Sequence, residues 1–67
     1  MRLVVNGQER STAVASVLEL WRAETGAETP AGYAVAVNGS LVRRDAWPST
    51  PLCDGDEVEI VRAVGGG

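Results

Sequence analysis

The chain has 67 residues, enough for one domain with a small core. Its formal net charge is −3, it has one cysteine and no histidine, and it has no apolar run of the ~20 residues that span a membrane. The cysteine and histidine counts exclude an internal disulfide framework and the usual zinc-ligand spacings. The negative charge argues against nucleic acid as a partner, and the lack of a long apolar run argues against a membrane. Because the N-terminus also does not resemble a signal peptide, the sequence predicts a cytoplasmic protein.

The first predicted element is a strand over residues 1–5, in which apolar side chains at alternate positions share one face. Asn6-Gly7 follows and favours a type I′ hairpin turn, because both residues tolerate φ > 0. A short second strand over residues 8–12 is therefore expected to pair back on the first.

A single helix is predicted over residues 17–25. Ser16 and Glu19 fit a capping box at its start, and Gly26 is placed to end it. The apolar stripe of this helix consists of Val17, Leu20 and Trp21. We expect Trp21 to lie in the core.

Residues 27–32 contain Pro30 and predict a loop. The apolar run over residues 33–37 predicts a third strand that is buried near the centre of the sheet. Asn38-Gly39 supplies a second hairpin turn, which leads into a short strand over residues 41–43.

Residues 44–52 contain two prolines and predict an irregular crossover or a single short helical turn, which Trp47 and Arg44 pack and cap. Asp54-Gly55-Asp56 resembles a catalytic carboxylate pair only superficially, and we interpret it as a tight turn. Residues 57–64 are predicted to form the last strand.

With one helix to cover one face of the strands, the sequence predicts an α+β domain over residues 1–64 and a glycine tail over residues 65–67. By analogy, a last strand inserted between the first and third would make a ubiquitin-like β-grasp fold, a mixed sheet of four to five strands packed on one helix. Cys53 is expected to be a small buried apolar side chain.

Alternation along the last strand predicts a docking face. Val58 and Ile60 are expected to face the helix, so that the intervening residues face outward on the open side of the sheet. The predicted face is an apolar patch, Val4, Ala36 and Val61, with Glu57 and Glu59 at its rim. Isolated apolar residues on a surface need no function, so both interpretations stay open at this point.

Several segments resemble, in their order and spacing, the ThiS family of sulfur carrier proteins in thiamine biosynthesis. These segments are Val5-Asn6-Gly7, residues 34–39, Arg44, Trp47, and residues 52–60 ahead of the glycine end. The resemblance runs from Met1 to Gly67. It implies a β-grasp carrier that is not an enzyme and binds no cofactor of its own.

The resemblance also implies a chemistry at the C-terminus. An adenylyltransferase related to ubiquitin-activating enzymes would use ATP to form an acyl-adenylate on Gly67. A cysteine-derived donor would then supply sulfur, and the resulting thiocarboxylate would serve thiazole synthase. Gly66 and Gly65 would let this end pass through a narrow channel, because glycine has no Cβ. The free protein is expected to be a monomer.

Other functions stay open on the sequence alone. A related carrier could serve molybdopterin or another sulfur-containing metabolite. A ubiquitin-like modifier could be joined to target proteins through Gly67, and a small adaptor would use the docking face without the glycines. Finally, glycines at the end of a chain can be a frayed terminus without a role.

Overall fold

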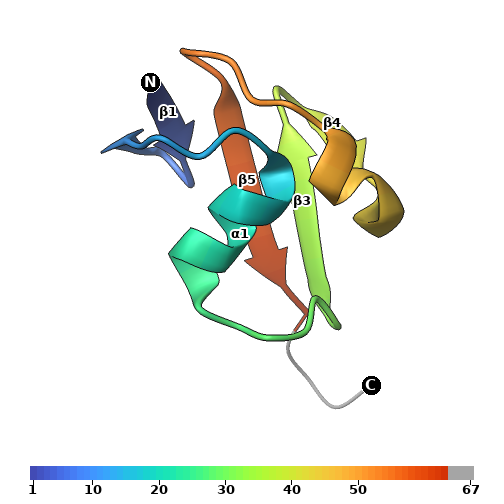
Figure 1. Cartoon of the computed structure of the whole chain (residues 1–67). Helices are drawn as coiled ribbons and strands as arrows, with labels where there is room; N and C mark the ends of the chain where they lie inside the picture. Colours follow the sequence, from blue (N-terminus) through green and yellow to red (C-terminus); the bar gives the residue numbers. More distant parts are fainter. Residues whose placement is uncertain (64–67) are drawn as a thin grey trace.

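A computed structural model describes residues 1–63, and within them the chain forms one sheet, one α-helix and one 3₁₀ helix (Figure 1). The elements are β1 (Arg2–Val5), β2 (Gln8–Ser11), α1 (Val17–Thr25), β3 (Tyr33–Val37), β4 (Ser40–Val42), η1 (Arg44–Ser49) and β5 (Glu57–Arg62). The sheet has five strands in the order β2-β1-β5-β3-β4, and α1 lies across one of its faces. The predicted α+β fold, with the last strand between the first and the third, is confirmed.

Strand β5 is the centre of this sheet. It runs parallel to β1, with Val5 opposite Val58, and antiparallel to β3, with Val35 opposite Ile60. The prediction that residues 33–37 lie buried near the centre holds only in part. β3 is an inner strand, but only Val35 is fully buried in it. Ala34 and Ala36 face the uncovered side of the sheet, and Tyr33 and Val37 pack against the core but are only partly buried.

Both Asn-Gly pairs form the predicted hairpin turns. The φ angles are 50° at Asn6 and 80° at Gly7, and 51° at Asn38 and 84° at Gly39. Positive φ at both central residues is what a type I′ turn requires, and its twist matches that of the flanking strands. These two turns set the register of β1 with β2 and of β3 with β4.

The helix has the predicted bounds because both of its ends are capped by local contacts. The Ser16 Oγ accepts a hydrogen bond from the Glu19 N–H at 3.2 Å, and the Glu19 carboxylate accepts one from the Ala15 N–H at 3.1 Å. At the other end, Gly26 has a φ of 67° and its N–H donates to the Arg22 carbonyl at 2.9 Å. A left-handed glycine here ends the helix.

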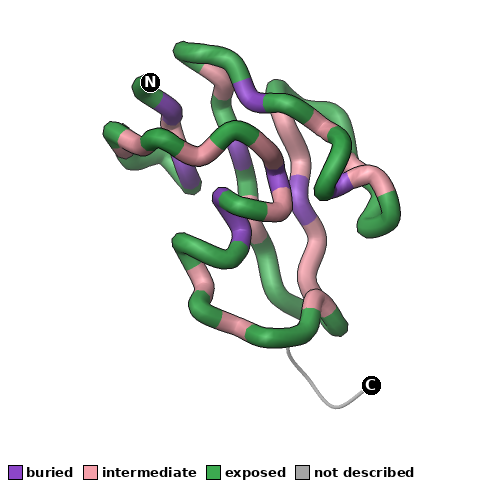
Figure 2. Tube along the Cα trace, in the orientation of Figure 1, coloured by how far each residue is buried: buried purple, intermediate pink, exposed green. Residues whose placement is uncertain are grey.

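The core lies between α1 and the sheet, and η1 closes its side. Figure 2 shows the buried positions on α1, on the inner strands and in the crossover. The buried residues are Leu3, Val5, Val17, Leu20, Trp21, Val35, Trp47, Leu52 and Val58. Trp21 packs against the rings of Tyr33 and Trp47, with centroids 5.4 and 5.3 Å away. The expectation that Trp21 is a core residue is confirmed.

Of the two predicted forms of the crossover, an irregular segment or a short helical turn, the structure shows the helical one, η1. The buried Trp47 side chain anchors η1 to the core, and its indole Nε1 donates to the Val42 carbonyl at 3.0 Å. Arg44 does not share this role. It is exposed and makes no side-chain hydrogen bond or ion pair within residues 1–63.

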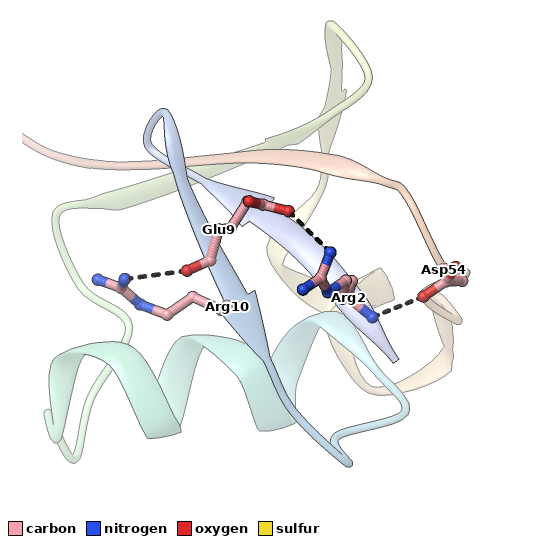
Figure 3. Close-up of polar contacts among 4 residues, drawn as sticks. All are labelled: Arg2, Glu9, Arg10 and Asp54. Carbon is pink, nitrogen blue, oxygen red and sulfur yellow. Dashed lines mark hydrogen bonds and ion pairs between the residues drawn. The ribbon is translucent and has the colours of Figure 1, made fainter.

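Two sequence expectations in the turn before β5 had different outcomes. Asp54 and Asp56 are turn residues, as predicted. The Asp54 carboxylate accepts from the Arg2 N–H at 2.6 Å (Figure 3), and the Asp56 carboxylate accepts from the Cys53 N–H at 2.8 Å. Cys53, however, is exposed, so the expectation that it is buried was wrong. Leu52 fills the core at this point, and the next residue along the extended chain points to solvent.

The predicted strands differ from the observed ones mainly at their ends. Met1, Thr12, Arg43 and Ala63 were expected within strands and lie just outside them, and Ser40 belongs to β4 although the predicted strand began at residue 41. The predicted last strand reached Val64, which lies outside the described residues, as do the glycines at positions 65–67.

Candidate docking face

The outward residues of β5 form the centre of the uncovered sheet face. Glu57, Glu59 and Val61 are exposed, whereas Val58 is buried and Ile60 packs against the core. Strand register then brings residues of the neighbouring strands alongside them. Val4 is opposite Glu57, and Ala36 is opposite Glu59. All five predicted docking residues therefore lie on one face; that they bind a partner stays a prediction.

Two further residues belong to this face and were missed from the sequence. Leu41 is opposite Ala36, and Ala34 is opposite Val61. Leu41 is the most exposed of the large apolar residues within residues 1–63, at 73%, and Val61 is 56% exposed. A two-residue hairpin turn at Asn38-Gly39 already implies that Leu41 and Ala36 pair, so the sequence contained the signal.

The face divides into two halves of different chemistry. An apolar half covers β3, β4 and the end of β5, and it consists of Ala34, Ala36, Leu41 and Val61. An acidic half covers β1, β2 and the start of β5, and it contains Glu9, Glu57 and Glu59. Val4, which was predicted within the apolar patch, lies in this half, opposite Glu9 on one side and Glu57 on the other. Charge and apolar surface are thus side by side, as in many protein interfaces.

The acidic half is only partly neutralised. Glu9 pairs with Arg2 at 3.5 Å (Figure 3), but both side chains are largely exposed, so the pair adds little stability. Glu57 and Glu59 make no ion pair within residues 1–63. A shallow hollow of about 440 Å³ lies beside them, lined by Val4, Asn6, Gly7, Glu57, Val58 and Glu59. This half therefore presents uncompensated negative charge.

At its C-terminal end, β5 makes contacts with β3 and with the residue just before β3. The Ala63 N–H donates to the Gly32 carbonyl at 2.7 Å. The Arg62 guanidinium lies over the Tyr33 ring, 5.5 Å from its centroid. The predicted modified residue Gly67 and the predicted passage residues Gly66 and Gly65 lie outside the described residues. Their roles stay predictions.

Two negative findings apply to residues 1–63. They hold no group of three or more histidine, cysteine, aspartate or glutamate side chains that could bind a metal ion. Among the same residues, no helix is both long and apolar enough to cross a membrane.

The central β5, parallel to β1 and antiparallel to β3, with one helix across the sheet, defines a ubiquitin-like β-grasp domain. Residues 3–67 match the model of the ThiS family. The chain belongs to this family.

Similar proteins of known structure agree with this assignment. The crystal structure of the thiamine biosynthesis protein ThiS from Geobacter metallireducens is 36% identical, with a TM-score of 0.81, and the match covers 100% of both chains. The solution structure of a thiamine biosynthesis protein from the same organism has a TM-score of 0.80 at 36% identity, over 100% of this chain and 88% of the other. At 36% identity, the resemblance covers sequence as well as fold.

One similar protein is much longer than this chain. A thiazole synthase of Paramagnetospirillum magneticum is 34% identical over 67 residues. The match covers 100% of this chain and only 20% of that protein.

Proposed function

We propose that the chain is a sulfur carrier protein that supplies sulfur for thiazole formation in thiamine biosynthesis. The observation that carries this proposal is the match to the ThiS family over residues 3–67, which includes the final glycines. The likeness to part of a thiazole synthase supports thiazole synthase as the sulfur acceptor, in preference to an enzyme of molybdopterin synthesis.

The proposed chemistry takes place on the Gly67 carboxylate and needs activation first. A carboxylate is a poor acyl donor, because its charge repels nucleophiles and an oxide is a poor leaving group. In the partner adenylyltransferase, a carboxylate oxygen attacks the α-phosphorus of ATP, and pyrophosphate leaves. A cysteine-derived sulfide then adds to the carbonyl carbon and displaces AMP, which leaves a thiocarboxylate. The chain is a co-substrate in these steps, and the catalytic groups belong to the partner.

A short tail requires a body that docks close to the active site. Residues 64–67 can reach at most about 13–14 Å beyond Ala63 when fully extended. Ordering them in a channel costs roughly 1–2 kcal/mol per residue in conformational entropy. The folded body must therefore supply most of the affinity, and its uncovered sheet face is the surface we assign to this contact. The apolar half would supply buried area, and the acidic half would select a partner surface with basic side chains.

The docking role of this face predicts that Val61→Glu weakens binding to the adenylyltransferase. The new carboxylate would lie in the apolar half, on the same strand face as Glu59 and directly opposite Ala34. Burying it unpaired in an interface should raise the Kd at least about tenfold. Titration calorimetry of the two purified proteins measures this change.

The matched control is Ala23→Glu, which places the same charge at an exposed position of α1. It should leave the Kd within about twofold, because it lies on the other side of the molecule from the uncovered sheet face. Equal Kd values for the wild type and Val61→Glu would show that this face does not bind the adenylyltransferase.

The sulfur acceptor is tested by reconstitution. The chain is incubated with the adenylyltransferase, ATP and a cysteine-derived sulfur donor, purified, and then given to thiazole synthase with its other substrates. In a parallel reaction, the large subunit of molybdopterin synthase replaces thiazole synthase. We expect product only with thiazole synthase. Turnover only in the parallel reaction would contradict the proposed pathway.

A further inference from the structure

The side chain of Asn6 takes the place of a missing strand beside β5. The ladder between β1 and β5 ends with the pair Val5 and Val58, yet β5 continues to Arg62. Beyond that pair, the Asn6 Oδ1 accepts from the Ile60 N–H at 2.8 Å, and its Nδ2 donates to the Ile60 carbonyl at 3.1 Å. A primary amide offers one acceptor and two donors, so it can occupy both backbone groups of one residue, as a neighbouring strand does.

This contact holds the half of β5 that leads to the glycines. On its other side, this half is paired with β3, with Ala34 opposite Val61 and Gly32 bonded to Ala63. On the β1 side, the Asn6 amide is the only group within residues 1–63 that bonds the backbone of Ile60. Without the Asn6 amide, this half of β5 would form hydrogen bonds only on the β3 side.

We propose that Asn6 is a positioning residue for the proposed adenylation: its amide fixes the direction in which β5 presents the C-terminal residues to the partner enzyme. This inference rests on the proposed function. Within residues 1–63, Asn6 makes hydrogen bonds to Val58 and Ile60, both on β5. It acts through β5. A displacement of about 1 Å at a reacting group can slow an enzymatic step by about 100-fold, so the direction of a short tail has a large effect on the rate.

The fold contains a matched control at the opposite end of the same strand. Asn38 also starts a type I′ turn, and its Oδ1 accepts from the Glu57 N–H at 2.9 Å while its Nδ2 donates to Asp56 at 3.0 Å. Glu57 is the first residue of β5, so this contact lies at the end remote from the glycines.

Asn6→Gly and Asn38→Gly are therefore equivalent changes at the two ends of β5. Glycine populates positive φ without strain, so each turn is retained, and each variant loses two side-chain hydrogen bonds. Any effect of lower stability alone should be similar for both variants. Only Asn6→Gly frees the end next to the glycines.

The test measures the rate of adenylation by the partner adenylyltransferase with ATP, as a function of the concentration of the carrier chain. We expect Asn6→Gly to lower kcat about tenfold, with KM for the chain changed by less than about threefold. The variant alters one residue that lines the hollow, but it leaves the apolar half and the three glutamates of the docking face unchanged. Asn38→Gly should leave both parameters within about twofold. Amide hydrogen exchange should be faster at Ile60 in Asn6→Gly and unchanged there in Asn38→Gly.

The outcomes separate this inference from the proposed function. If the wild-type chain is adenylated and both variants have the same kcat, the positioning role is overturned and the carrier function stands. Unchanged exchange at Ile60 in Asn6→Gly would also overturn it. If the wild-type chain is not adenylated at all, the proposed function is overturned, and the positioning role with it.

Discussion

Replacing Trp21 with alanine is expected to lower the free energy of unfolding by about 3–5 kcal/mol. The side chain is 1% exposed and packs against both Tyr33 and Trp47, so its removal opens a cavity between α1 and η1. A domain of this length has a total stability of only about 3–10 kcal/mol. Trp21→Ala should therefore be largely unfolded at 37 °C. Urea unfolding followed by far-ultraviolet circular dichroism measures the difference.

Phenylalanine variants separate packing from hydrogen bonding at this site. The Trp21 Nε1 is buried and has no hydrogen-bond partner within residues 1–63, so Trp21→Phe loses volume but no hydrogen bond. Trp47→Phe loses similar volume and also the bond to the Val42 carbonyl, and should be less stable than Trp21→Phe by about 1 kcal/mol. If Trp21→Ala unfolded at the same urea concentration as Trp21→Phe, the aromatic cluster would not be the centre of the core.

Deletion of Gly66-Gly67 is expected to abolish sulfur transfer and leave the fold intact. The proposed reacting carboxylate would then be on Gly65, too short by two residues, or about 7 Å of extended chain, to reach the adenylation site. The core residues all lie between Leu3 and Val58, so the urea midpoint should not change. Reconstituted thiazole formation and urea unfolding measure the two properties.

Gly65→Ala is the control for this deletion, because it alters the tail without shortening it. Of the two predicted passage residues, Gly65 is the one farther along the chain from the proposed reacting carboxylate, so a methyl group there should reduce transfer by less than about threefold. Thiazole formation by the truncated chain at the wild-type rate would refute the carrier function.

The parts of the fold that could be predicted from the sequence depend on local contacts. The Ser16 cap and the left-handed Gly26 define the helix within a few residues, and the two Asn-Gly turns need only their own backbone angles. Strand ends were less accurate, because they depend on partner strands that lie far away in the sequence. The pairing of β5 with β1 joins residues more than 50 apart, and analogy to a known fold was needed to predict it.

The residues of the candidate site could be predicted where the alternation of side chains along a strand determines which face they lie on. They could not be predicted where a side chain forms hydrogen bonds with backbone that is distant in the sequence. Val4 and Val61 were placed on the open face by counting along strands. Asn6 was interpreted only as a turn residue, because nothing near it in sequence reveals its contact with Ile60. Cys53 was expected to be buried from its residue type, but its place in the turn decides its exposure.

Whether this chain carries sulfur at Gly67 can be read from the intact mass of the protein purified from its native host. We expect a species heavier than the unmodified chain by the exchange of one oxygen for one sulfur, with the change confined to the C-terminal fragment after proteolysis. A covalent adduct with another protein through Gly67 would indicate a ubiquitin-like modifier. Only unmodified chain, in cells that are actively making thiamine, would contradict the carrier function.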